Sequence, residues 1–161
     1  MKIASFNVNG IKARLHQLTA WLPEAQPDVV VLQEIKTVDE GFPAEMIEDL
    51  GWQVWTHGQK SWNGVAILSR LPITDAGDRD YAGLGHARHV AARLDNGVTI
   101  HNFYVPAGGD VPDRALNPKF GQKLDFIERM TRWSEDLREP SLIVGDFNVA
   151  PLECDVWNHK A

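Results

Sequence analysis

The first third of the chain carries apolar residues at two different spacings, separated by a proline and by polar turns. Ile3 to Val8 reads as a strand, and a continuous apolar run over residues 28–33, DVVVLQ, is typical of a strand covered on both faces. Between them, apolar positions recur at the spacing of one helix face. These positions are Leu15, Leu18, Leu22 and Ala25, and Pro27 ends the pattern because proline cannot continue a helix. The chain is therefore predicted to open as β-α-β.

A short helix and two strands are predicted next. The helix lies between Pro43 and Leu50, and Gly51 ends it. Three apolar residues share one of its faces: Met46, Ile47 and Leu50. The strands cover Gln53 to Thr56 and Val65 to Ser69, on either side of a polar turn.

The second half of the chain predicts a hairpin, a long helix and a last strand. Asp95-Asn96-Gly97 interrupts the β-rich stretch over residues 92–105, as turn residues do in a hairpin. Pro118 suits the first turn of a helix that ends before Pro140. Its apolar face comprises Phe120, Leu124, Ile127 and Met130. The last strand, SLIVGDFN over residues 141–148, has Leu142-Ile143-Val144 as a buried segment. Consecutive strands without helices between them pair antiparallel, so the predicted fold class is α/β (α+β) with a mixed, mostly antiparallel sheet.

The length and net charge of the chain limit the classes of function that it can have. The chain has 161 residues, which suits one domain, and no linker divides it. The net charge of −6 argues against a general basic surface for nucleic acid, so any phosphate binding is expected to be local. No apolar run is long enough for a membrane span, and the first ten residues do not resemble a signal peptide. A single cysteine, Cys154, fits a reducing compartment, and we expect a cytoplasmic protein without a membrane partner.

Polar residues follow four of the apolar segments. Asn7 and Glu34 end the first two strands, Tyr104 ends the hairpin, and Asp146 and Asn148 project from the same side of the last strand. Each has a structural alternative: Asn7 as a turn former, Glu34 as the ion-pair partner of a lysine two residues on, Tyr104 as a core aromatic, and the Asp-x-Asn pair as an Asx turn. Together they are oxygen donors suited to a hard divalent cation and to phosphodiester hydrolysis.

The histidines and common motifs give weaker signals. Solvated or structural roles are expected for His16, His57, His86, His89, His101 and His159. The phosphate-binding P-loop, the dinucleotide fingerprint, the H-E-x-x-H motif and paired C-x-x-C motifs do not occur. Nucleotide kinases, Rossmann enzymes and zinc sites are therefore not leading candidates.

Four stretches together resemble the endonuclease/exonuclease/phosphatase superfamily, and within it the bacterial exodeoxyribonuclease III branch of apurinic/apyrimidinic endonucleases. They are FNVNGIKAR (residues 6–14), LQEIK (32–36), NFYVPAGG (102–109) and GDFNVAP (145–151), in the order of the family. The resemblance implies an αββα sandwich of two sheets between helical layers.

The resemblance also implies roles for the polar residues. Mg²⁺, or Mn²⁺ in its place, would be bound by Asn7, Glu34, Asp146 and Asn148. The substrate phosphate would contact Asn7, Lys36, Tyr104 and Asn148. Asp146 would orient or deprotonate the attacking water, with Tyr104 and Asn148 as further catalytic residues.

The implied function is a Mg²⁺-dependent phosphodiesterase of base-excision repair. Its substrates would be double-stranded DNA with abasic sites, for endonuclease action, or with 3′ ends, for 3′–5′ exonuclease action. Family members run beyond Ala161 and carry a Ser-Asp-His motif that does not occur here. We therefore expect residues 1–161 to be the N-terminal part of a single domain, an incomplete four-layer sandwich that self-associates where the full-length form is a monomer.

Two alternatives remain open from the sequence. One is a superfamily phosphatase acting on inositol phosphates or lipid head groups. The other is a noncatalytic nucleic-acid-binding protein or inactive fragment of the same fold.

Overall fold

Two four-stranded sheets pack face to face in the computed structural model, which describes residues 1–157. The first sheet has the strand order β1-β2-β4-β3, with β1 parallel to β2 and the other pairs antiparallel. Its strands are β1 (Ile3–Asn7), β2 (Val29–Gln33), β3 (Gln53–His57) and β4 (Val65–Ser69). The two central strands, β2 and β4, are buried along their whole length, as the continuous apolar run in β2 predicts.

The second sheet has the order β5-β6-β7-β8, and β7 and β8 form its parallel pair. Its strands are β5 (Ile73–Asp75), β6 (His89–Leu94), β7 (Thr99–Tyr104) and β8 (Ser141–Asp146). The predicted hairpin is β6 and β7, and Gly97 has a positive φ of 84° in its turn. Four of the six strand pairings are antiparallel, which confirms the predicted mixed, mostly antiparallel character.

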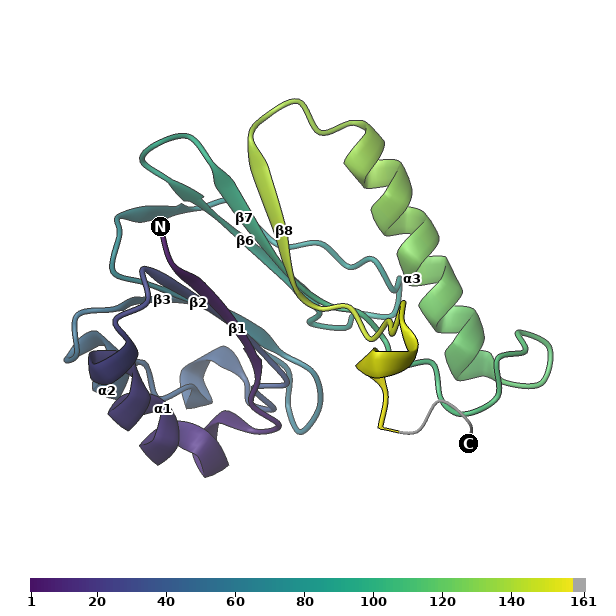
Figure 1. Ribbon diagram of the computed structural model, residues 1–161, viewed down its shortest axis with the longest axis horizontal. Coiled ribbons are helices and arrows are strands. Elements are labelled where there is room, and N and C mark those ends of the chain that lie inside the picture. The colour runs from purple at the N-terminus through teal and green to yellow at the C-terminus, as the bar shows by residue number, and fades with distance from the viewer. Residues whose placement is uncertain (158–161) are drawn as a thin grey trace.

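Helices cover the outer face of each sheet, so the fold has the αββα layers that the family resemblance implied (Figure 1). On the first sheet lie α1 (Ile11–Ala25) and α2 (Ala44–Glu48), and on the second lies α3 (Pro118–Glu135). Short 3₁₀ turns cover Asp39–Gly41 and Glu153–Asp155. The backbone N–H of Gln26, in the left-handed conformation, caps α1 one residue before Pro27. Asn117 caps α3, and Pro118 follows at the first helical position.

Several details of the sequence prediction are wrong. Of the three residues predicted to share an apolar face of α2, only Ile47 is buried; Met46 and Leu50 are exposed, and Leu50 lies beyond the end of the helix at Glu48. In α3, Ile127 and Met130 of the predicted apolar face do pack against the core, but the buried centre of the helix is Phe126, which the prediction did not include.

The predicted burial of the last strand is also wrong. Leu142, Ile143 and Val144 are only half-buried, because β8 is an edge strand with one neighbour. The short strand β5 was not predicted, since its three residues carry too little pattern to identify a strand.

Two further predictions from the sequence concern a membrane span and the role of His159. No helix within residues 1–157 is long and apolar enough to cross a membrane. His159 lies outside the described residues.

Candidate active site

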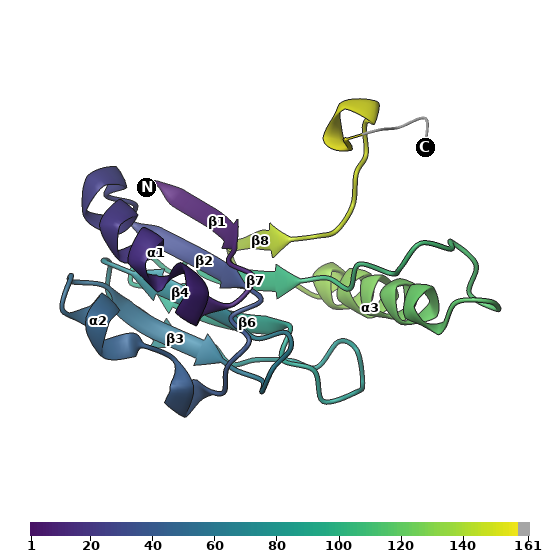
Figure 2. The ribbon, with the colours of Figure 1, turned by 90° about the horizontal axis from the view of Figure 1, so that it is seen from below.

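Period-2 alternation brings polar side chains to one end of the space between the sheets. Ile3, Val31, Ile100 and Val144 pack in the apolar core between the sheets. Two to four residues further along the same strand faces lie Asn7 in β1, Tyr104 in β7 and Asp146 in β8, and Glu34 directly follows β2. Figure 2 shows β1, β7 and β8 pointing the same way, so their carboxyl ends meet at one edge of the sandwich.

Hydrogen bonds connect these residues across the two sheets. The Asn7 amide donates from Nδ2 to Glu34 Oε1 at 2.9 Å and to Asp146 Oδ2 at 2.9 Å. Tyr104 Oη donates to Glu34 Oε1 at 2.7 Å, and Lys36 Nζ pairs with Glu34 Oε2 at 2.9 Å. We call these five residues the active-site cluster. Each sheet supplies part of it, so its geometry depends on how the sheets are placed relative to each other.

The loop after β2 holds Glu34 and Lys36 in an uncommon backbone conformation. Both residues have φ of 54°, in the left-handed region that non-glycine residues seldom adopt. Backbone hydrogen bonds fix the turn: Gly10 N–H donates to the Glu34 carbonyl at 2.7 Å, and Lys36 N–H donates to the Asn63 carbonyl at 2.9 Å. Such strain persists only where the surroundings determine it, and it is found most often at functional sites.

The cluster keeps Glu34 ionised and Tyr104 protonated. Burial alone would raise the pKa of Glu34, but hydrogen bonds from Asn7, Tyr104 and Lys36 outweigh it, so the pKa lies below its usual value. Burial, followed by the hydrogen bond to Glu34, raises the pKa of the Tyr104 phenol well above 10. At neutral pH the site therefore contains a carboxylate acceptor beside a phenol donor.

The site contains two cationic side chains, Lys36 and Arg88. Lys36 is paired with Glu34, whereas Arg88 was not among the residues predicted from the sequence. The Arg88 guanidinium lies 4.6 Å from the centroid of the Tyr104 ring, and Nη1 donates to the Tyr104 carbonyl at 3.2 Å. Burial lowers the pKa of Arg88, while Tyr104 and Glu34 act in the opposite direction. Nothing in the sequence around Arg88 distinguishes it from a surface arginine, because its proximity to Tyr104 arises from strand pairing.

Asn148 lies near the cluster, but it does not share the orientation that the strand pattern predicted. The strand ends at Asp146, and Asn148 has a φ of 50°. Its backbone N–H donates to Asp146 Oδ1 at 3.0 Å, which is an Asx turn, and its side chain donates to the Val105 carbonyl at 2.8 Å. The structural alternative for this pair is therefore realised, while Asp146 still reaches Asn7.

A lysine that the sequence analysis did not select ties the neighbouring loops together. Lys123 Nζ, from α3, donates to the Ala107 carbonyl at 3.2 Å and to the Asn148 carbonyl at 2.5 Å. It thereby fixes the loop after β7 against the loop after β8.

The donors present fit a hard divalent cation. Glu34 and Asp146 offer carboxylate oxygens within a shared hydrogen-bond network, and oxygen ligands of this kind suit Mg²⁺ and Mn²⁺. Asn7 turns its amide nitrogen to the carboxylates and its oxygen to the Asn9 N–H, so in this arrangement it positions them as a donor. Within residues 1–157 no group of three or more His, Cys, Asp or Glu side chains could hold a metal ion, so a cation here would have two carboxylates as protein ligands and oxygens of water or substrate besides.

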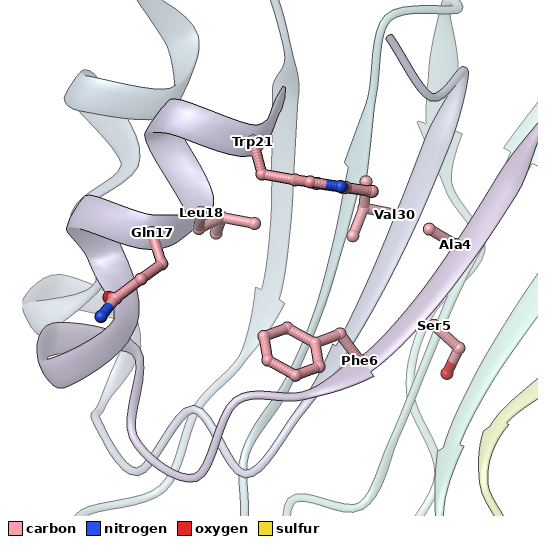
Figure 3. Close-up of a pocket in the computed structure, with 7 residues that line it drawn as sticks. All are labelled: Ala4, Ser5, Phe6, Gln17, Leu18, Trp21 and Val30. Carbon is pink, nitrogen blue, oxygen red and sulfur yellow. The ribbon is translucent and has the colours of Figure 1, made fainter. Parts of the chain in front are cut away.

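A groove lies on the other side of β1 from the active-site cluster, and its lining differs in chemistry from that cluster. It runs between β1 and α1, and its walls include Phe6, Leu18, Trp21 and Val30 (Figure 3). Figure 3 shows Ser5 directed to the opposite side of β1 from Phe6. The lining of this groove carries no charged side chain that could neutralise a phosphate.

Comparisons with known proteins identify the family to which the chain is similar. The family model described as Endonuclease/Exonuclease/phosphatase family matches residues 4–153. Exodeoxyribonuclease III of Haemophilus influenzae is 39% identical over 97% of this chain and 60% of its own length.

Two solved structures are similar to the chain as well. An AP endonuclease from Archaeoglobus fulgidus has a TM-score of 0.80 and 32% identity, over 94% of this chain and 59% of that chain. A 3′ phosphatase from Neisseria, bound to product DNA hairpin, has a TM-score of 0.84 and 33% identity, over 98% of this chain and 62% of that chain. The chain thus spans about three fifths of the length of these relatives.

Proposed function

The chain belongs to the endonuclease/exonuclease/phosphatase family, and on this premise we propose that it carries the catalytic cluster of a divalent-metal-dependent phosphodiesterase acting on DNA. The observation that carries the proposal is the convergence of Asn7, Glu34, Tyr104 and Asp146 from four strand ends of two sheets. We propose duplex DNA as substrate, with abasic-site endonuclease and 3′–5′ exonuclease activities, in base-excision repair. The names of the relatives, an exodeoxyribonuclease III and an AP endonuclease, support this choice.

The metal would be held by Glu34 and Asp146. Asn7 would hold the two carboxylates at a fixed separation, since its amide donates to both. When bound, the cation would neutralise the charge on the phosphoryl oxygens and on the departing oxygen. Mg²⁺, or Mn²⁺, is the cation that this oxygen donor set favours.

The remaining residues would act on the phosphate and on the attacking water. The protonated Tyr104 phenol can donate a hydrogen bond to a phosphate oxygen in place of Glu34, and Lys36 supplies a positive charge beside it. Asp146 would orient the water and accept its proton. Asn148 would contact the phosphate or the water only after its side-chain amide breaks its hydrogen bond to the Val105 carbonyl. It is therefore the proposed residue whose side chain must rearrange before it can act.

Because the chain has a negative net charge, DNA binding would depend on the cationic side chains at the site. At a net charge of −6 the surface as a whole repels DNA, so binding energy has to come from the site itself and from the shape of the duplex. Lys36 pairs with Glu34 and Arg88 lies beside the Tyr104 ring, so both cations would meet the phosphate there. An exposed Cys154, the one cysteine of the chain, agrees with the reducing cytoplasm that we propose as its location.

A nicking assay tests the proposal. Duplex DNA with one abasic site is incubated with the protein in Mg²⁺ and then in chelator, beside the variant Asp146→Asn and a matched surface control, Asp136→Asn, at the end of α3. We expect metal-dependent nicking that Asp146→Asn loses and Asp136→Asn retains. Nicking that survives both chelator and Asp146→Asn would disprove the assigned site.

A second candidate activity, removal of a 3′ phosphate from DNA ends, is favoured by the similarity to the Neisseria 3′ phosphatase. The same site could serve both reactions, because each attacks a phosphorus atom bonded to a 3′ oxygen. Substrates ending in 3′ phosphate, tested beside abasic duplex and a soluble inositol phosphate, rank the activities. Turnover of the inositol phosphate alone would favour the lipid or inositol phosphatase alternative, and salt-sensitive DNA binding without turnover would favour the noncatalytic one.

A further inference from the structure

Two buried side-chain amides lie between the apolar core and the active-site cluster. Gln33 ends β2, Asn102 lies in β7 two residues before Tyr104, and both side chains are fully buried. They occupy the space between the sheets, between the apolar layer of Val31 and Ile100 and the cluster itself. We call Gln33 and Asn102 the amide layer. Gln33, the one polar residue of the otherwise apolar β2, is the sequence signal that could have indicated this layer.

Asn102 connects the two sheets by three hydrogen bonds. Its Nδ2 donates to the Leu32 carbonyl of β2 at 2.8 Å and to the Ala66 carbonyl of β4 at 2.9 Å. Its Oδ1 accepts from Gln33 Nε2 at 2.8 Å. Within residues 1–157, every buried side-chain hydrogen bond that joins strands of the two sheets involves Asn102. The apolar contacts around it are nondirectional, whereas these hydrogen bonds depend on direction and distance, so they can set the offset of β7 against β2.

One oxygen of the amide layer disfavours the folded state, which points to a role of the layer other than stability. Gln33 Oε1 is buried and has no hydrogen-bond partner among the described residues. A buried polar group without a partner disfavours the folded state, and an apolar pair of similar shape would avoid that cost. In some proteins, buried polar groups of this kind fix one arrangement of a core where apolar packing would allow several.

We propose that Asn102, with Gln33, is a positioning residue that sets the offset between the two sheets, so that Tyr104 of one sheet meets Glu34 of the other. Glu34 follows Gln33 directly, and Tyr104 follows Asn102 at the next position on the same strand face. A shift of one sheet against the other at the amide layer would also displace the residues of the active-site cluster. It would alter the 2.7 Å hydrogen bond between Tyr104 and Glu34 and the two hydrogen bonds that Asn7 donates. The inference rests on the proposed function for its kinetic consequence, whereas its structural consequence can be measured independently.

The kinetic test uses variants that keep the approximate shape of the side chains and remove the amides. Asn102→Leu removes the three bonds, and Gln33→Met/Asn102→Leu removes the whole layer and its unpartnered oxygen. The matched control is Val31→Ala/Ile100→Val, because these residues lie two positions earlier on the same two strands and are equally buried. We expect both amide variants to lower kcat on abasic duplex by about 10- to 100-fold with little change in KM, as for other supporting contacts of active sites. The control should retain kcat.

Tyr104→Phe distinguishes positioning from general loss of structure. If Asn102 acts through the Tyr104 phenol, Asn102→Leu should cost less kcat in the Tyr104→Phe background than in the original protein. Equal losses in both backgrounds, an unchanged kcat in the double amide variant, or an equal fall in the Val31/Ile100 control would each overturn the proposal. Measuring both amide variants keeps the result decisive if Asn102→Leu alone fails to fold.

A spectroscopic readout separates this inference from the proposed function. The chain has two tyrosines, so 3-fluorotyrosine labelling gives two ¹⁹F resonances, and Tyr81→Phe assigns them. In the amide variants the Tyr104 resonance should move toward its position in Glu34→Ala, where the phenol has lost its acceptor, while the control leaves it in place. If the original protein cleaves no DNA, the proposed function fails and this shift alone decides the inference. A Tyr104 resonance that stays unchanged in folded amide variants would refute it.

Discussion

Acidification from pH 7 to pH 5 should destabilise the folded protein through a buried histidine pair. His89 and His101 are almost fully buried beside Trp133 and Phe103, and His89 Nε2 lies 3.1 Å from His101 Nδ1. Burial lowers the pKa of His89 to about 3, with help from the charges of His101, Arg79 and His57. Burial, followed by Arg79, lowers the pKa of His101 to about 4. Both rings are therefore neutral in the folded protein.

The magnitude follows from linkage. The unfolded chain protonates its histidines near pH 6.5, and the folded protein does so only near pH 4 or below, so the unfolded state binds more protons in between. Stability is therefore lost as pH falls below 6.5. Below pH 6.5, each ring lowers the free energy of unfolding by about 1.4 kcal/mol per pH unit. At pH 5 the loss is about 2 kcal/mol for each ring and about 4 kcal/mol for the pair. Carboxylates such as Glu34, whose pKa is lowered, lose their contribution only below about pH 4.5 and hardly affect this window.

Urea unfolding at pH 7, 6 and 5 measures the effect. The free energy of unfolding should fall by about 4 kcal/mol in the original protein, as an order of magnitude. In His89→Leu/His101→Leu, which removes both partners of the buried bond, most of this fall should disappear. His16→Gln, on the exposed side of α1, should behave like the original protein. A pH-independent stability in the original protein, or an undiminished fall in the double leucine variant, would refute the reasoning.

Three further predictions concern the site and the open edge of the first sheet. Lys36→Met should raise the pKa of Glu34 in the metal-free protein, because Lys36 helps to lower it; a ¹³C carboxyl titration that shows no rise would contradict this. Gly145→Ala should destabilise by about 2 to 4 kcal/mol, since φ is 134° and a Cβ would lie 2.0 Å from the Phe103 carbonyl oxygen. Chemical denaturation should show a smaller loss for Gly77→Ala, where φ is also positive but the space is open. Phe6, 49% exposed on edge strand β1, should promote self-association that Phe6→Lys reduces in sedimentation velocity, and a monomer at high concentration would argue against it.

The sequence by itself determined most elements and the residue types of the site. Period and turn chemistry are local properties, so they predicted α1 before Pro27, the β6–β7 hairpin at Gly97 and α3 after Pro118. The family motifs selected Asn7, Glu34, Lys36, Tyr104 and Asp146, which the structure does bring together. Their catalytic roles stay predictions.

Only the tertiary structure decided how these residues face one another. Asn7 and Asp146 are 139 residues apart and meet because β1 and β8 end at the same edge of two packed sheets. The approach of Arg88 to Tyr104 and the amide layer of Gln33 and Asn102 likewise depend on strand pairing and sheet packing. The same is true of the half-burial of β8 and the Asx turn at Asn148. Local sequence fixes the backbone preference and the alternation of side chains, but which strand becomes a neighbour is set by burial of apolar surface across the whole domain.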